Sequence, residues 1–198
     1  MSKHEKKSPD ISLKVLLFDE SESGKTCMMK QYANKEFSYW GAATIGYDFK
    51  TKYITIDDKL VKYMIMDTPG HHLFKESALC YIQICDGVIV VYAIDDRRSF
   101  EIVEDSIKDV YNRANKNICV TLVGNKCDLE SERKVTTQEG KDLAKKYGAH
   151  FYETSAKDGT NIDECFTDIA NECIKRHCYT ENKQQKKEET KQDDCSII

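Results

Sequence analysis

The stretch LKVLLFDESESGKT (residues 13–26) joins an apolar run, Leu13–Phe18, to a loop that ends in Gly24, Lys25 and Thr26. The apolar run predicts a buried β-strand. A loop between a strand and a helix N-terminus turns its backbone N–H groups inward and, with the helix dipole, forms an anion site. In the pattern Gly-x-x-x-x-Gly-Lys-Ser/Thr, the lysine reaches the β- and γ-phosphates and the hydroxyl ligates Mg²⁺. The stretch therefore predicts a phosphate-binding loop, although an ordinary strand-to-helix turn can carry the same residues.

The loop departs from this pattern at its first position, where Asp19 replaces the expected glycine. A carboxylate facing a polyphosphate would weaken binding, whereas one turned into solvent would be tolerated. The sequence leaves both possibilities open. The predicted nucleotide contacts in this part of the chain come from the loop and the first helical turn: Glu20, Ser21, Glu22, Ser23, Gly24, Lys25, Thr26 and Cys27.

Three further short motifs follow: DTPG (residues 67–70), NKCD (residues 125–128) and SAK (residues 155–157). Asp67 ends the apolar stretch Leu60–Met66, so it is expected at the carboxyl end of a strand, where open α/β sheets bind their ligands. There its carboxylate can hold Mg²⁺ through a water molecule. Because a lone Asp-x-x-Gly is common in turns, this assignment depends on Lys25 upstream.

The NKCD motif follows the apolar run Val120–Val123, a predicted buried strand that delivers Asn125, Lys126 and Asp128 to the same sheet edge. A carboxylate at Asp128 can accept hydrogen bonds from N1–H and from the 2-amino group of guanine. Adenine has neither donor and would leave the carboxylate unpaired, at about 1–3 kcal/mol per lost bond. The motif therefore favours guanine.

The SAK motif consists of Ser155, Ala156 and Lys157 and follows a short predicted strand. Here the N–H of Ala156 can meet the guanine carbonyl, although a plain loop is equally compatible with the tripeptide alone. The four motifs in this order are a stronger signal than any one of them. Together they predict a guanine nucleotide site with GTP or GDP and Mg²⁺ as ligands.

Length and composition agree with one compact domain. A chain of 198 residues can bury a single α/β core and is short for two domains. Nine cysteines, scattered and odd in number, without a recognisable signal peptide, favour reduced thiols in the cytosol. The net charge of −4 gives no indication of a nucleic-acid surface, and no apolar run approaches the length of a membrane span.

Strands and helices alternate along the chain, a pattern typical of a mostly parallel sheet with helices on both faces. Six strands are predicted: Leu13–Phe18, Phe49–Ile56, Leu60–Met66, Val88–Ile94, Ile118–Gly124 and His150–Glu153. The short gap between the second and the third predicts an antiparallel hairpin at one edge. Helix signals include a capping box of Thr136 with Glu139, a stop at Gly148 and an N-cap at Asn161. The fold class is α/β, with a flexible segment 1–10 before a domain of residues 11–178.

The last part of the chain differs in composition. Residues 179–194 nearly lack large apolar side chains and mix lysines with acids, so we expect residues 179–198 to form a flexible tail. The tail ends in CSII (residues 195–198), a C-a-a-X sequence that marks Cys195 for prenylation, and the aliphatic last residue leans toward geranylgeranyl. One lipid gives only marginal membrane residence, and the balanced charges of the tail add little attraction to anionic lipid. The sequence thus predicts membrane attachment through a prenylated Cys195.

Five segments of the chain are similar to those of one known family. They are TIGYDF (residues 44–49), DTPG (67–70), VVY (90–92), NKCD (125–128) and ETSAK (153–157). On these segments the chain resembles a Rab, a branch of the Ras superfamily of small GTPases, from about Leu13 to Cys178. The Ile-Gly-x-Asp-Phe segment is more specific to Rabs than the nucleotide motifs. The resemblance implies a three-layer P-loop NTPase (small G-protein) fold, with a six-stranded, mostly parallel sheet and one antiparallel edge strand.

The resemblance also implies a GTP/GDP switch that recruits effectors on vesicle membranes. In such a switch Thr44 would ligate Mg²⁺ and sense the γ-phosphate, the N–H of Gly70 would meet the same phosphate, and Phe37 would pack on the guanosine. Loss of that phosphate frees both segments and so reports hydrolysis to partners. Effectors would dock on the switch segments and on three further positions: Phe49, Tyr81 and, in place of the usual tryptophan, Met66.

The same resemblance implies further partners and a location. It predicts an exchange factor, a GTPase-activating protein and a prenyl-binding chaperone. It places a monomeric protein in the cytoplasm and on the cytosolic face of an intracellular vesicle or of the plasma membrane. No nucleic acid is expected among the partners.

The chain departs from the Rab pattern after Gly70, where His71 replaces the glutamine that orients the attacking water. The stretch DTPGH is similar to translation elongation factors, in which that histidine does the equivalent work, so His71 can be a working substitute. Pro69, in contrast, removes an N–H and stiffens the loop. We assign catalysis to His71, Gly70 and Lys25, and expect GTP hydrolysis to be very slow without an activating protein.

Two other classes of function remain open. One is a scaffold that holds a nucleotide with little turnover, or that has lost the nucleotide through Asp19. The retained Lys25, Thr26, Thr44 and Asp128 argue against complete loss. The other is a P-loop kinase or ATPase, which the guanine preference of NKCD makes improbable and which competition with ATP would separate.

Overall fold

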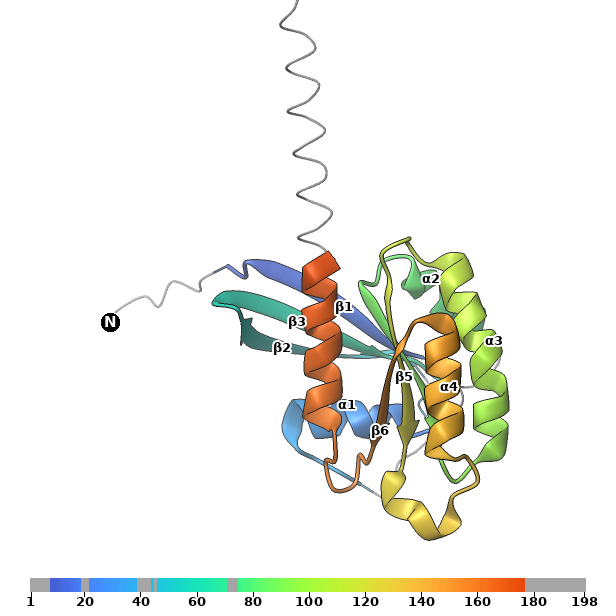
Figure 1. Cartoon of the computed structure of the whole chain (residues 1–198). Coiled ribbons are helices and arrows are strands. Elements are labelled where there is room, and N and C mark those ends of the chain that lie inside the picture. Colours follow the sequence, from blue (N-terminus) through green and yellow to red (C-terminus); the bar gives the residue numbers. More distant parts are fainter. Residues whose placement is uncertain (1–7, 19–21, 39–43, 45, 71–74, 177–198) are drawn as a thin grey trace, which may run out of the picture.

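The computed structural model describes residues 8–18, 22–38, 44, 46–70 and 75–176. At its centre is a six-stranded sheet in the order β2-β3-β1-β4-β5-β6 (Figure 1). The strands are β1 (Ile11–Phe18), β2 (Asp48–Ile56), β3 (Lys59–Asp67), β4 (Gly87–Ala93), β5 (Cys119–Asn125) and β6 (His150–Thr154). Only β2 pairs antiparallel to its neighbour β3, and the other pairings in the described part of the chain are parallel. The predicted α/β class, the six strands and the antiparallel edge strand are confirmed.

Helices cover both faces of the sheet (Figure 1). They are α1 (Lys25–Asn34), α2 (Lys75–Ile82), α3 (Arg97–Arg113), α4 (Thr137–Tyr147) and a helix of residues 162–176. Successive strand residues point to opposite faces, so β1 contributes to two cores. Leu13, Val15 and Leu17 pack with α1 and the helix of residues 162–176, whereas Leu16 and Phe18 pack with α2, α3 and α4. The sheet is therefore the middle of three layers.

The hairpin between β2 and β3 turns on two residues, Asp57 and Asp58. Both have positive φ, 47° and 61°. Two consecutive residues of this kind form the type I′ turn, whose twist matches that of the flanking strands. Aspartate adopts this conformation more readily than most residues, so the turn fixes the register of the hairpin that the sequence predicted.

The sequence predicted three signals at helix ends, and two of them are found in the structure. Thr136 and Glu139 form a reciprocal capping box at the start of α4, and Gly148 ends this helix with a φ of 64°. Both predictions are confirmed. Asn161 precedes the helix of residues 162–176, but its side chain is used differently from the predicted N-cap. Asn161 has a φ of 55°, and its Nδ2 donates to the carbonyl oxygen of Glu153 at 2.7 Å. This side chain therefore joins the helix start to β6.

The parallel strands give the sheet two distinct edges. At the carboxyl edge Asp67 ends β3 and Asn125 ends β5, and Asn125 lies in register with Ala93 of β4 and Thr154 of β6. At the opposite edge Nη1 of Arg176 donates to the carbonyl oxygen of Ile118, just before β5, at 2.6 Å. The helix of residues 162–176 therefore ends on the side of the sheet away from the motifs.

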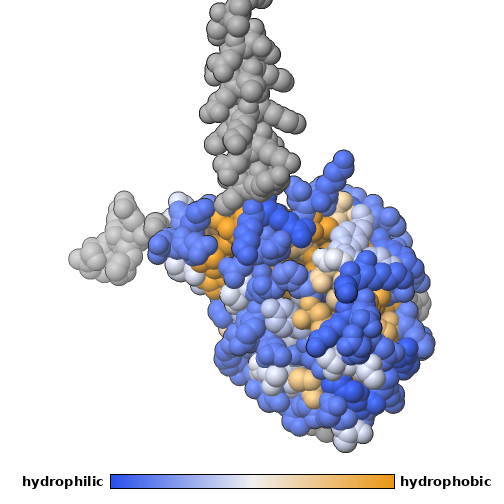
Figure 2. Space-filling model, in the orientation of Figure 1, coloured by the Kyte–Doolittle hydropathy of each residue, from blue (hydrophilic) through white to orange (hydrophobic). Residues whose placement is uncertain are grey.

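The surface over α4 and over the helix of residues 162–176, called the C-terminal helix below, is mostly hydrophilic, with smaller apolar areas between them (Figure 2). In the described part of the chain, the most exposed large hydrophobic side chains are Phe49, Tyr53, Ile84 and Tyr111. None of the described helices combines the length and apolarity that a membrane crossing requires.

Candidate functional site

The predicted phosphate loop is described from Glu22 onward. Glu22 and Gly24 have positive φ, 66° and 90°, so the backbone turns sharply before α1. Ser23 and Lys25 are buried, at 1% and 5% exposure. Gly24 occupies the N-cap of α1 without a side-chain hydrogen bond, and the first turn contains no acidic residue. The described first turn of α1 thus carries no acidic side chain of its own that would repel an anion at the positive end of the helix dipole.

Several predicted site residues lie outside the described residues. They are Asp19, Glu20, Ser21, His71 and Cys195. The two orientations of the Asp19 carboxylate are therefore not distinguished, and the roles of the other four residues stay predictions. Cys27, at the start of α1, is half-buried, and burial raises the pKa of its thiol.

Three oxygen-bearing side chains meet beside the phosphate loop. The Thr26 hydroxyl donates to Oδ2 of Asp67 at 2.5 Å and lies 2.8 Å from Oγ1 of Thr44. Because the Thr26 hydrogen is used toward Asp67, Thr44 is the donor of the second bond. Residues 26, 44 and 67 were predicted separately as metal ligands, and the structure brings them together.

The Asp67 carboxylate is suited to a cation. It is fully buried, and its Oδ1 has no hydrogen-bond partner among the described residues. Burial raises the pKa of the Asp67 carboxyl, opposed by the Thr26 hydrogen bond and by the positive charge of Lys25. A buried carboxylate oxygen without a partner, next to two hydroxyl groups, matches the hard oxygen ligands that Mg²⁺ prefers. The residues present therefore fit the predicted magnesium ion.

Removal of Mg²⁺ tests this arrangement. We expect EDTA to accelerate the release of bound GDP from the wild-type chain by about tenfold or more, because the cation neutralises phosphate charge. In Asp67→Asn the release should already be fast and respond little to EDTA. Displacement of a fluorescent GDP analogue measures both rates. Asp58→Asn, in the β2–β3 turn, is the control and should keep the wild-type response; an unchanged EDTA response in Asp67→Asn would contradict the assignment.

Asn125 joins three parts of the predicted nucleotide site. Its Nδ2 donates to the carbonyl oxygen of Ser23 at 2.8 Å. Its Oδ1 accepts from Oγ1 of Thr154 at 3.1 Å and from the N–H of Ala156 at 3.3 Å. The sequence predicted that Asn125 belongs to the nucleotide site and that the N–H of Ala156 meets the guanine carbonyl, whereas the structure gives both groups partners within the protein. Their contact with guanine stays a prediction.

The predicted base-recognising carboxylate is held from the SAK loop. Oδ1 of Asp128 accepts from the Ser155 hydroxyl at 2.7 Å, and Oδ2 lies 3.8 Å from Nζ of Lys157. The Asp128 side chain keeps 14% exposure. Nζ of Lys126 lies 3.4 Å from Oδ1 of Asp95 at the end of β4. The structure therefore brings the NKCD and SAK motifs together at the same sheet edge as Asp67.

The residues expected at the partner surface differ in their exposure to solvent. Phe49 is 44% exposed and Tyr81 is partly buried, with 6.4 Å between their ring centroids. The expectation that Met66 belongs to this surface is wrong, because Met66 is 2% exposed and packs in the core with α2. Tyr47 was missed: its ring lies 4.7 Å from that of Tyr81 and its hydroxyl lies 2.5 Å from Oγ of Ser77. The sequence feature that could have identified Tyr47 is its aromatic side chain within the segment of residues 44–49.

The two remaining expectations in this region are not tested by these contacts. Phe37 is partly buried against the core of α1 and the C-terminal helix, and Gly70 follows a buried Pro69. Packing of Phe37 on guanosine and the contact of Gly70 with the γ-phosphate stay predictions.

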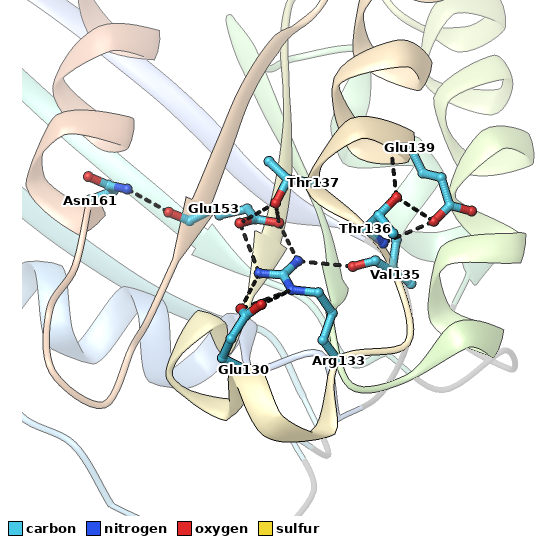
Figure 3. Close-up of polar contacts among 8 residues, drawn as sticks. All are labelled: Glu130, Arg133, Val135, Thr136, Thr137, Glu139, Glu153 and Asn161. Atoms are coloured by element: carbon cyan, nitrogen blue, oxygen red, sulfur yellow. Dashed lines mark hydrogen bonds and ion pairs between the residues drawn. The ribbon is translucent and has the colours of Figure 1, made fainter.

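A second polar network lies next to the NKCD and SAK segments and was not predicted. The guanidinium of Arg133 lies between the carboxylates of Glu130 and Glu153 (Figure 3). The sequence placed Glu153 at the end of a predicted strand and at the start of ETSAK, with no role assigned to its side chain. Arg133 follows the NKCD segment without any local motif that would mark it.

Comparison with known proteins agrees with this geometry. A model of the Ras family matches residues 14–175. Ras-related protein Rab-13 of Canis lupus familiaris is 37% identical over 168 residues, which cover 85% of this chain and 83% of that protein. Ras-related protein Rab-8B of Dictyostelium discoideum is 35% identical over 173 residues, covering 87% and 85% respectively. Ras-related protein Rab11A of Lotus japonicus is 37% identical over 163 residues, covering 82% and 72%.

Proposed function

Because the chain belongs to the Ras family of small GTPases and is Rab-like, we propose that it is a GTP/GDP switch that recruits effectors in vesicle trafficking. Family membership implies guanine nucleotide binding and GTP hydrolysis. The observation that carries the switch proposal is the contact of Thr44 with Thr26 beside the buried, unpaired oxygen of Asp67. Thr44 belongs to the segment that leads into the edge strand β2, so a change at the metal site reaches the partner surface directly.

Each part of the site has a proposed role. Lys25 and the first-turn N–H groups of α1 hold the phosphates, and Thr26, Thr44 and Asp67 hold Mg²⁺. Bound Mg²⁺ would neutralise phosphate charge during the transfer to water. Gly70 and His71 lie beyond β3, where the N–H of the glycine would meet the γ-phosphate and the imidazole would orient the attacking water. Asp128 selects guanine. Loss of the γ-phosphate removes the contact that holds Thr44 and Gly70, which frees both segments.

The remaining proposals concern the location of the switch. Prenylation of Cys195 would attach the protein to the cytosolic face of a vesicle or of the plasma membrane, with a prenyl-binding chaperone carrying it between membranes. Effectors would dock on the exposed Phe49 and the partly buried Tyr81 beside it. An exchange factor and a GTPase-activating protein would set the ratio of the two nucleotide states. The protein would act as a monomer.

A second candidate is a scaffold that holds nucleotide with little turnover. The observation that favours it is Pro69, which is buried directly before the segment of His71 and has no N–H to offer. A stiffened loop restricts the approach of His71 to the attacking water, so the fold and the nucleotide would persist while hydrolysis is lost.

Nucleotide content and single-turnover hydrolysis test both candidates. We expect the denatured full-length protein to release about one guanine nucleotide per chain. Hydrolysis of loaded GTP by the isolated chain should be slower than about 10⁻³ s⁻¹, because no partner positions His71. His71→Ala should slow it further. An unchanged rate in His71→Ala would remove the histidine from the mechanism. Bound GTP that is not measurably hydrolysed would support the scaffold that holds nucleotide. A protein that neither contains nor takes up GTP with Mg²⁺ would support a scaffold that has lost the nucleotide through Asp19.

A further inference from the structure

We propose that Arg133 is a positioning residue for guanine recognition, and that its guanidinium fixes the distance between the NKCD and SAK loops. The inference rests on the guanine nucleotide site described above and adds a specificity-determining residue to it. Arg133 itself lies behind the two loops and acts through the residues that it holds.

The guanidinium uses every donor that it has. Nη1 and Nη2 donate to the two carboxylate oxygens of Glu153 at 2.6 and 3.1 Å, a bidentate pair. Nε and Nη2 donate to Glu130 at 2.9 and 2.7 Å, and the second hydrogen of Nη1 goes to the carbonyl oxygen of Val135 at 2.9 Å. An arginine has five N–H donors in a rigid fork, and here each one meets an acceptor (Figure 3). The side chain is therefore held in one orientation.

Glu153 is also held by two other side chains. Its carboxylate accepts from the Thr137 hydroxyl, at the start of α4, at 3.1 Å to each oxygen. Its carbonyl oxygen accepts from Nδ2 of Asn161, which begins the last described helix. Arg133 and Glu153 are only 16% and 17% exposed, so their ion pair is screened less by solvent than a surface pair. Glu153 thus offers a rigid point of attachment.

The sequence positions of these groups connect the pair to guanine recognition. Glu130 lies two residues after Asp128, in the 3₁₀ helix η2 (Cys127–Glu132), and Glu153 lies two residues before Ser155. The Ser155 hydroxyl completes this chain of contacts by donating a hydrogen bond to Oδ1 of Asp128 at 2.7 Å. One guanidinium therefore connects the loop that carries the base-recognising carboxylate to the loop that orients it.

The backbone of the NKCD loop makes such a connection necessary. Lys126 has a φ of 65°, and Leu129 has non-helical angles inside η2. Irregular backbone of this kind lacks a continuous hydrogen-bond ladder, so side chains have to fix its position. Hydrogen bonds to Glu130 and Glu153 raise the pKa of Arg133, and the bond from Arg133 lowers the pKa of Glu130, so Arg133 and Glu130 are both charged near neutral pH.

The test compares two bases in the full-length, nucleotide-loaded protein. Arg133→Gln removes the charge and the fork. We expect release of GDP to become about tenfold faster, the effect of losing charge-assisted hydrogen bonds. The ratio of the affinities for GDP and inosine diphosphate should also fall, because inosine lacks the 2-amino group that only a well-placed Asp128 can recognise. Glu153→Gln should reproduce both changes, and Arg133→Lys should lie between, since an ammonium cannot form the fork.

The matched control is Arg97→Gln. It removes a second arginine–glutamate pair, Arg97 with Glu139 between α3 and α4, and the described hydrogen bonds of these two side chains do not reach the NKCD or SAK segments. This variant should keep the wild-type release rate and base ratio. Wild-type GDP release in Arg133→Gln, or equal loss of affinity for both nucleotides, would overturn the positioning role while leaving the proposed function intact. A wild-type chain that binds no guanine nucleotide would overturn the proposed function itself.

Discussion

Replacing Asn125 with alanine is expected to lower the free energy of unfolding by about 3 kcal/mol or more and to abolish tight GDP binding. The mutation removes three hydrogen bonds at a residue that is 1% exposed. It removes the Asn125 side chain that now bonds to the carbonyl of Ser23, the hydroxyl of Thr154 and the N–H of Ala156. Each buried polar group left unpaired costs about 1–3 kcal/mol.

Urea unfolding with and without GDP measures this effect. A bound ligand adds to apparent stability, so the wild-type protein should gain from GDP and the variant should gain little. Asn115→Ala is the control, because Asn115 is exposed and its Nδ2 makes one hydrogen bond, to the carbonyl oxygen of Gln83 at 2.9 Å. This variant should change stability by less than about 1 kcal/mol. Equal destabilisation by the two alanines would show that Asn125 has no special place in the site.

Gly24→Ala should have the second large effect, a loss of GDP affinity of about a hundredfold or more. The φ of 90° at Gly24 is unfavourable for any residue with a Cβ. A Cβ built there would lie 2.3 Å from Nδ2 of Asn125. The Asn125 side chain cannot move aside without breaking the hydrogen bonds that join the phosphate loop to β6 and the SAK loop. The strain therefore falls on the phosphate loop itself.

Gly148→Ala separates backbone strain from this collision. Gly148 also has a positive φ, 64°, but a Cβ there would meet no atom within 4 Å. We expect this variant to lose about 1 kcal/mol of stability and to bind GDP with wild-type affinity. Fluorescence titration with a GDP analogue measures both variants. If Gly24→Ala bound GDP as well as Gly148→Ala does, the close approach to Asn125 would not matter for the site.

Most of the fold could be predicted because its signals are local. The apolar run before Asp67 marks β3, and the short polar gap at Asp57 and Asp58 marks the hairpin. The capping box of Thr136 and Glu139 marks the start of α4. These patterns involve residues that are near one another in sequence, where periodicity and capping rules apply. The convergence of Thr26 and Asp67 followed from the parallel strand order, which places the carboxyl ends together.

The remaining features depend on contacts between distant segments. Met66 belongs to an apolar strand whether its side chain faces solvent or α2, so only the packing shows that it is buried. Asn125 belongs to the NKCD motif, from which the sequence predicts guanine selection. Its hydrogen bonds, however, go to Ser23 and Ala156, which lie about 100 and 31 positions away from it in the chain. Arg133 is one of many surface-type residues until Glu153 is brought beside it. No window of sequence contains these pairs.

The contact of Arg176 with Ile118 has a mechanical consequence. Tension applied through the chain beyond residue 176 would enter the domain where this guanidinium meets the amino end of β5. The helix of residues 162–176 would carry the load along the sheet, packed by Ile169 and Cys173 against Gly87. Asp67 and Asn125 lie at the other ends of their strands, so we expect such a pull to strain the opposite edge of the sheet before it disturbs these two residues.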